Sequence, residues 1–188
     1  MSLASIMQLQ ALNKLIKGQL KAWPVSSTMI LGIAGGNGLE HIRDSGIKKV
    51  YGVDINAAYL SETSIRYQDL GNILELLCID LHKCSGKLPR AELLIANLLV
   101  EYIGCGCFQQ VVQQVEPIYV SCVIQVNTGV SWVSDSPYLH VFDGLKQVYH
   151  QIGADMLRES MSGIGYRYIG ALEYPLPNGK KLVRLDFK

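Results

Sequence analysis

The sequence lacks a large charge of either sign. Only 18% of its 188 residues are charged, and the formal net charge is +1. It also lacks both an apolar run near the roughly 20 residues that span a bilayer and the charged start, apolar stretch and cleavage site of a secretory signal. These absences argue against nucleic-acid and membrane partners, and we expect a cytoplasmic protein.

Paired cysteine motifs are absent as well. The cysteines are odd in number and show no C-x-x-C spacing typical of a zinc site, in a chain too long to need disulfides. They are Cys78, Cys84, Cys105, Cys107 and Cys122. We therefore expect free thiols and no bound metal. We interpret the one close pair, Cys105 and Cys107, as small residues at the start of a helix.

Internal repeats, low-complexity tracts and linkers are also missing, so we expect one domain over residues 1–188. Its leading segment, residues 1–24, has apolar residues at steps of three and four, which predicts an amphipathic helix ending at Pro24. These apolar residues are Ile6, Leu9, Leu12, Ile16, Leu20 and Trp23. The core is expected over residues 28–188.

Within the core, the hydrophobic period alternates between strand and helix. Strands are predicted at residues 28–33, 49–54, 73–79, 92–96 and 118–126. Helices follow the strands; one begins at Asn56 and is closed by Gly71, and the last is predicted over 145–156. This alternation predicts an α/β fold, a three-layer, doubly wound sheet that is mostly parallel. Two further strand-like stretches, 166–174 and 181–187, are separated by a short turn containing Pro175 and Gly179, which predicts a C-terminal antiparallel hairpin and seven strands in total.

A glycine-rich loop follows the first predicted strand. Residues 30–40 read ILGIAGGNGLE, in which an apolar strand runs into four glycines and then into a helix. Glycine tolerates positive φ and lets a ligand approach the backbone, and the N–H groups at a helix start attract anions. The loop is therefore predicted to bind a nucleotide cofactor.

Two dehydrogenase interpretations fail on the residues. The dinucleotide motif G-x-G-x-x-G would need a third glycine where the chain has His41. Gly32, Gly36 and Gly38 fit the G-x-x-x-G-x-G loop of short-chain dehydrogenases, but none of the ten tyrosines has the lysine four residues later that this family carries.

The order of elements, the glycine loop, the acids Asp54 and Asp80 and the closing hairpin together resemble class I S-adenosylmethionine-dependent methyltransferases. The resemblance covers residues 28–188 and implies S-adenosyl-L-methionine as cofactor. The family's first motif is an acid followed by three glycines at alternate positions. These positions are occupied by Gly32, Ala34, Gly36 and Gly38. Gly32 removes a carboxylate that in the family helps to hold the amino end of methionine, so another group or a water would take its place.

The resemblance also assigns roles to residues after the second and third strands. Asp54 would accept from both ribose hydroxyls, and Asp80 would accept from the exocyclic amine of adenine, because a carboxylate is an acceptor with two oxygens. Ile55 and Leu81 would form apolar walls for the adenine ring. The alternatives are a polar strand end for Asp54, the N-cap of a helix starting at Leu81 for Asp80, and core packing for the two apolar residues.

The fourth strand ends at Asn97, at the edge of the sheet where α/β proteins bind ligands. Family members that methylate amino groups of bases or of glutamine carry two prolines and an aromatic residue after this position, and this chain has neither proline. Asn97 would contact cofactor or substrate, or else be a satisfied strand-end amide. Glu101 and Tyr102 would line an acceptor pocket, or else form an ordinary exposed helix start.

The segment after the fifth strand, residues 127–140, lacks a clear period and is a candidate lid. Within it, Tyr138 and His140 are candidate substrate residues; His140 is either a general base or a solvated loop histidine. No catalytic residue is assigned, because methyl transfer from a sulfonium requires mainly alignment of the reactants and exclusion of water.

We therefore interpret the chain as an S-adenosylmethionine-dependent methyltransferase with a small-molecule acceptor. One alternative is a methyltransferase-like binding module without activity, which the glycine at position 32 favours. Another is an RNA methyltransferase, against which the neutral charge argues.

Overall fold

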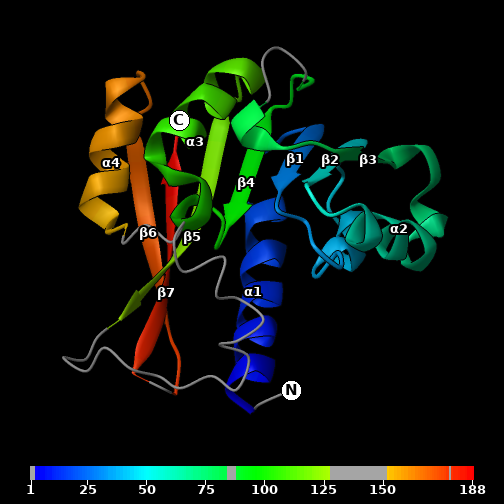
Figure 1. Ribbon diagram of the computed structural model, residues 1–188, viewed down its shortest axis with the longest axis horizontal. Helices are drawn as coiled ribbons and strands as arrows, with labels where there is room; N and C mark the ends of the chain where they lie inside the picture. The colour runs from blue at the N-terminus through cyan, green and yellow to red at the C-terminus, as the bar shows by residue number, and fades with distance from the viewer. Residues whose placement is uncertain (1–2, 84–87, 128–151, 178) are drawn as a thin grey trace.

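A single mixed β-sheet organises the chain. The computed structural model describes residues 3–83, 88–127, 152–177 and 179–188, with side chains from residue 7 onward. Within them the sheet has seven strands in the order β3-β2-β1-β4-β5-β7-β6 (Figure 1). The strands are β1 (Ser27–Leu31), β2 (Lys49–Asp54), β3 (Leu74–Cys78), β4 (Leu93–Asn97), β5 (Tyr119–Asn127), β6 (Tyr168–Pro175) and β7 (Lys180–Phe187).

The first five strands are parallel, and the last two form an antiparallel hairpin. β1 pairs with β2 and β4, β2 with β3, and β4 with β5, all in parallel. β7 runs antiparallel to both β5 and β6. The central strand β4 is buried from Leu93 to Ala96, as expected for a parallel strand covered on both faces. The predicted α/β fold with its closing hairpin is confirmed.

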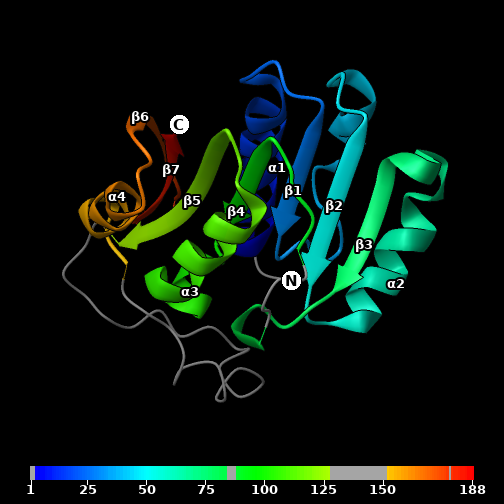
Figure 2. The same ribbon diagram turned by 90° about the horizontal axis from the view of Figure 1, so that it is seen from above.

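Helices cover both faces of the sheet (Figure 2). The α-helices are α1 (Leu3–Lys21), α2 (Ala57–Arg66), α3 (Val100–Val115) and α4 (Ala154–Gly163); the 3-10 helices are η1 (Leu39–Asp44), η2 (Gln68–Ile73) and η3 (Leu81–Lys83). On one face Phe108 of α3 and Leu157 of α4 enter the larger core cluster. On the other, Ile16 of α1 and Leu60 of α2 pack against Ile30 and Ile95.

Three helices differ from the prediction. The helix expected from residue 56 to 71 ends as an α-helix at Arg66, because Tyr67 leaves helical geometry and Gly71 has φ 49°. The helix after the glycine loop is a short 3-10 helix. Its N-cap residue is Gly38, which has no side chain with which to cap it. α4 begins at Ala154, and most of the helix predicted over 145–156 lies outside the described residues.

No helix in the described ranges has both the length and the hydropathy required to cross a bilayer.

Candidate cofactor-binding site

A cavity of about 230 Å³ opens at the carboxyl ends of the parallel strands. This volume is below the roughly 300–1,000 Å³ of sites that enclose a whole drug-sized ligand, so the cavity suits part of a larger cofactor. Its lining comes from the ends of β1, β2 and β3 and from the first turn of α3. The lining residues are Gly32, Val53, Asp54, Ile55, Ile79, Asp80, Leu81, His82, Leu99, Tyr102 and Ile103.

The glycine loop that follows β1 has an alternating backbone conformation. Gly32, Ala34, Gly36 and Gly38 have φ of 65°, 46°, 74° and 93°. Alanine in this region is strained, because its Cβ crowds the carbonyl oxygen. The loop therefore holds one strained residue, Ala34, between glycines that accept this conformation at lower cost.

Two loop glycines are required by packing within the protein. A Cβ on Gly36 would lie 2.7 Å from Cε2 of Tyr67, and a Cβ on Gly38 would lie 2.7 Å from Cγ2 of Ile16. The sequence prediction explained these glycines by positive φ, which both adopt, and by the close approach of a ligand. In the structure, contacts with α1 and with the residue after α2 already exclude side chains at both positions.

Gly32 borders the cavity, where Leu99 occupies the space beside it. A Cβ at position 32 would lie 3.1 Å from Cδ1 of Leu99, and the φ of 65° disfavours any side chain there. An acid at this position would therefore need Leu99 to shift and would hold a strained backbone conformation.

Asp54 joins the loop to the end of β2. Its Oδ2 accepts from the Ala34 N–H at 2.9 Å, and its Oδ1 accepts from the Asn56 N–H at 2.9 Å. An ionised carboxylate has about four acceptor sites, so two backbone bonds leave acceptor capacity. This half-buried group lines the cavity while it fixes the loop.

Asp80 lines the cavity and also begins η3. Its Oδ1 accepts from the His82 N–H at 3.0 Å, and its Oδ2 lies 3.2 Å from Nζ of Lys83. The hydrogen bond from Lys83, together with that from His82, holds the pKa of Asp80 below its usual value. The helix-start alternative is therefore present, and the same carboxylate still borders the cavity.

The two predicted apolar walls, Ile55 and Leu81, both line the cavity. Ile55 is 66% exposed, so it does not belong to the core, and Leu81 is half-buried. Core packing therefore does not explain Ile55, whose side chain lies at the wall of the cavity.

Asn97 is directed away from the cavity, toward α1. Its Nδ2 donates to Oε1 of Gln19 at 2.8 Å, and its Oδ1 accepts from Nε2 of Gln19 at 2.9 Å. The fully buried Gln19 also donates to Oγ of Ser121 at 2.9 Å. Asn97 is thus a satisfied strand-end amide and is not part of the described cavity lining, in contrast to the cofactor contact expected for it.

Glu101 and Tyr102 occupy different environments on the first turn of α3. Glu101 is 1% exposed, which excludes an ordinary exposed helix start for this residue, whereas Tyr102 lines the cavity. Glu101 Oε1 accepts from the Gln125 N–H at 2.8 Å, and its buried Oε2 has no hydrogen-bond partner among the described residues. Burial raises the pKa of Glu101 and, with the nearby Glu101 charge, that of Tyr102.

The other candidates and several new residues complete the site. Tyr138 and His140 lie outside the described residues. The sequence interpretation missed Leu99 and His82 in the lining and Gln19 behind Asn97. A signal for Gln19 existed, since it is a polar residue beside Ile16 and Leu20 in the apolar stripe of the first helix. In the described ranges, no three His, Cys, Asp or Glu side chains are grouped so that they could hold a metal.

Comparison with known proteins supports the fold assignment. No protein-family model and no curated protein matches the sequence. Solved structures do match: the N-methyltransferase NodS from Bradyrhizobium japonicum WM9 has a TM-score of 0.67 at 10% identity, over 95% of this chain and 94% of that chain. Geranyl diphosphate methyltransferase with GPP and sinefungin has a TM-score of 0.71 at 11% identity, over 95% of this chain and 78% of its own.

The chain thus has the fold of class I S-adenosylmethionine-dependent methyltransferases, as the sequence resemblance predicted. The [4+2]-cyclase SpnF matches equally well, with a TM-score of 0.70 at 11% identity over 95% of this chain and 82% of that chain. Since proteins of one fold can differ in reaction, the activity has to be argued from the site.

Proposed function

We propose that the cavity binds the adenosine part of S-adenosyl-L-methionine and that the chain transfers the methyl group to a small molecule. The observation that carries this proposal is a single cavity lined by Gly32, Asp54 and Asp80, from three successive parallel strands. A nucleoside needs acceptors for its amine and its hydroxyls and apolar walls for its base. This lining provides all of them.

The residues fit the cofactor in the following way. Asp54 would accept from the ribose hydroxyls with the acceptor sites that Ala34 and Asn56 leave available. Asp80 would accept from the exocyclic amine of adenine, between the side chains of Ile55 and Leu81. The ribose 5′ substituent would continue from Gly32 along the backbone of the loop, whose shape Gly36 and Gly38 maintain.

When bound, the cofactor supplies a methyl group activated by its sulfonium sulfur. The chain's own contribution is to align the acceptor and keep water out. Tyr102, on the cavity side of α3, is the described residue that we assign to this acceptor side. We keep Tyr138 and His140 as proposed acceptor residues from the sequence.

A small-molecule acceptor is supported by the near-neutral charge of the chain. It is also supported by similar proteins, one of which is named for geranyl diphosphate and another for magnesium protoporphyrin IX. Structures of NodS and of geranyl diphosphate methyltransferase contain S-adenosyl-L-homocysteine and S-adenosylmethionine, respectively, which supports the choice of cofactor.

The first prediction tests the cofactor. Isothermal titration calorimetry should give micromolar binding of S-adenosyl-L-homocysteine. Asp54→Asn should weaken it about 10- to 100-fold, because a hydrogen bond to a charged group contributes about 1.5–3 kcal/mol. Asp155→Asn removes an exposed carboxylate on α4 and serves as the matched control. Absence of heat from folded wild-type protein would refute the cofactor, and unchanged affinity in Asp54→Asn would refute the ribose role.

Turnover distinguishes an enzyme from a binding module. Methyl-labelled S-adenosylmethionine, incubated with the protein and a metabolite extract, should yield a labelled small molecule. Cofactor binding without labelled product from any extract would favour the inactive module.

A further inference from the structure

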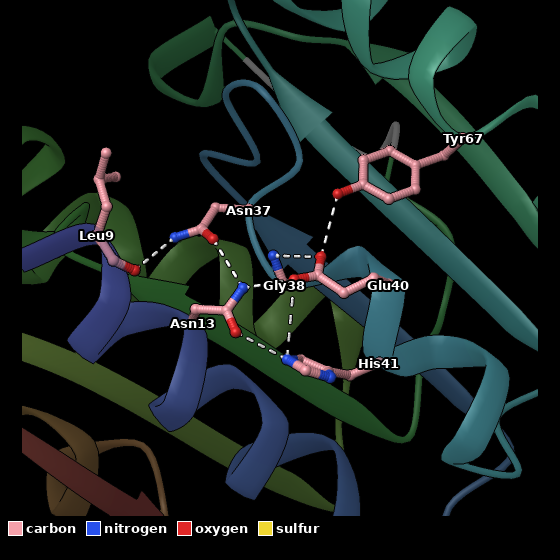
Figure 3. A network of polar contacts seen from close by, with 7 residues as sticks. All are labelled: Leu9, Asn13, Asn37, Gly38, Glu40, His41 and Tyr67. Atoms are coloured by element: carbon pink, nitrogen blue, oxygen red, sulfur yellow. Dashed lines mark hydrogen bonds and ion pairs between the residues drawn. The ribbon is translucent and has the colours of Figure 1, made fainter. Parts of the chain in front are cut away.

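The glycine loop is fixed at both of its ends. At the start, the N–H groups of Gly32 and Ile33 donate to the Val53 carbonyl at 2.8 and 3.1 Å. At the other end, a network of polar side chains connects the loop to α1 and to Tyr67, which follows α2 (Figure 3). Ala34 and Gly35, both exposed, lie between these two anchors. Within this segment Ala34 also donates to Asp54 and accepts from Thr63.

Asn13 is the centre of this network on the α1 side. Its Nδ2 donates to Oδ1 of Asn37 at 2.9 Å and to Oε1 of Glu40 at 2.6 Å, and its Oδ1 lies 2.9 Å from Nε2 of His41. Asn37 also donates from its Nδ2 to the Leu9 carbonyl at 3.0 Å. One amide of α1 therefore contacts three residues in and after the loop.

Glu40 extends the network to the other side of the loop. Its Oε2 accepts from the Gly38 N–H and from the Tyr67 hydroxyl, each at 3.1 Å. Asn13 and Tyr67, on separate elements, thus meet at one carboxylate. The burial of this carboxylate opposes ionisation. The bonds from Asn13, from a backbone N–H and from Tyr67, together with the nearby His41, outweigh burial and keep the pKa of Glu40 below its usual value.

We propose that Asn13 is a positioning residue for the ligand, acting through Glu40 on the loop segment between the two anchors. The proposal rests on the proposed function, because it assigns the ligand's amino-acid half to this segment. The cavity beside Gly32 holds the adenosine half, so a group attached to the ribose 5′ carbon continues over Ala34 and Gly35.

The physical reason is preorganisation. A loop with positive φ at every second residue is costly to order, and a network that orders it before binding spares the ligand this cost. Loss of Asn13 would transfer the cost to the binding step. The loss would fall mainly on ligands that contact this loop segment, because Asp80, Ile55 and Leu81 hold the adenosine half from other elements.

Two ligands separate these halves. S-adenosyl-L-homocysteine and 5′-methylthioadenosine share the thioadenosine group, and only the former has the amino-acid half. In calorimetry, Asn13→Ala should weaken S-adenosyl-L-homocysteine binding about tenfold, the size expected when hydrogen bonds to a charged group are lost. Binding of 5′-methylthioadenosine should change by less than about twofold.

Further variants keep the test decisive. Tyr67→Phe removes only the hydroxyl that donates to Glu40 from the opposite side. It should give the same selective loss of S-adenosyl-L-homocysteine binding, so the test remains possible if Asn13→Ala does not fold. The double variant should lose less than the product of the single effects, because both act through one carboxylate. Gln10→Ala, at an exposed α1 position, is the control and should bind both ligands like wild type.

The outcomes are distinct. Equal wild-type and Asn13→Ala affinities for S-adenosyl-L-homocysteine, or equal losses for both ligands, would overturn the positioning role and leave the proposed function intact. Failure of folded wild-type protein to bind either ligand would overturn the proposed function and this inference with it.

Discussion

At the residue scale, Glu101 shows how one side chain extends a sheet beyond the end of a strand. β4 ends at Asn97, and Leu98 turns away with φ 54° while its N–H donates to the Val123 carbonyl. Two residues further along β5, the Gln125 N–H has no β4 carbonyl opposite it and donates to Glu101 instead. The second carboxyl oxygen of Glu101 is buried without a partner among the described residues, so the neutral form of this acid is favoured.

Glu101→Gln should therefore flatten the dependence of stability on pH. The folded pKa of Glu101 is raised by burial, so its contribution to stability is complete below the unfolded pKa of about 4.3. That contribution is lost as pH rises through the folded pKa. Glutamine stays neutral and can still accept from Gln125. At pH 8 the free energy of unfolding of the variant should be at least that of wild type. The expected excess is about 1.4 kcal/mol for each unit by which burial raises the pKa of Glu101.

Urea unfolding between pH 4 and pH 8 measures this effect. Glu159→Gln, at an exposed position on α4, is the matched control. Parallel stability curves for Glu101→Gln and wild type would contradict the interpretation.

At the element scale, the glycine loop is the junction at which α1 and the end of α2 meet the first strand. A Cβ on Gly38 would meet Ile16 of α1, and a Cβ on Gly36 would meet Thr63 and Tyr67. Thr63 also donates to the Ala34 carbonyl at 2.9 Å. The loop conformation is thus determined by two helices that pack against it.

Gly38→Ala tests this junction against Gly46→Ala. Both glycines have positive φ, 93° and 78°, so alanine should cost about 1–2 kcal/mol at either position. A Cβ at Gly38 would lie 2.7 Å from Ile16, whereas one at Gly46 would have no neighbour within 4 Å. Gly38→Ala should therefore lower the free energy of unfolding, measured in urea, by about 1–3 kcal/mol more than Gly46→Ala does. Equal losses of stability in the two variants would show that α1 moves to accommodate the added Cβ.

At the scale of the whole molecule, a series of hydrogen bonds between buried and half-buried polar side chains joins α1 to both halves of the sheet. Gln19 bonds Asn97 on β4 and Ser121 on β5, and Ser121 donates to Oδ1 of Asp186 on β7 at 2.6 Å. Arg184 donates from Nε to the same oxygen at 2.8 Å. These bonds fix the position of α1 relative to the parallel and antiparallel strands.

Gln19→Leu should therefore destabilise the whole fold without changing the cofactor site. The variant leaves the half-buried Asn97 amide without its partner, which costs about 1–3 kcal/mol. The buried Ser121 hydroxyl loses the bond from Gln19 and keeps the one to Asp186. We expect the free energy of unfolding to fall by about 2–4 kcal/mol, measured in urea. The affinity of the folded protein for S-adenosyl-L-homocysteine should stay within about twofold of wild type. A tenfold loss would indicate that Asn97 belongs to the cofactor site.

The sequence by itself determined the order of strands and helices and the place of the two acids. Alternating hydrophobic periods mark the elements, and the carboxyl ends of parallel strands meet at one edge, so Asp54 and Asp80 had to come near each other. The hairpin was also readable, since its turn is short and local.

Only the tertiary structure decided the roles of residues whose partners are distant in the sequence. Asn97 pairs with Gln19 across 78 residues, Gly38 meets Ile16, and Leu99 occupies the space beside Gly32. Glu101 is buried because β5 continues past the end of β4. Local periodicity gives the face of an element on which a residue lies, whereas these pairings depend on how the helices dock on the sheet.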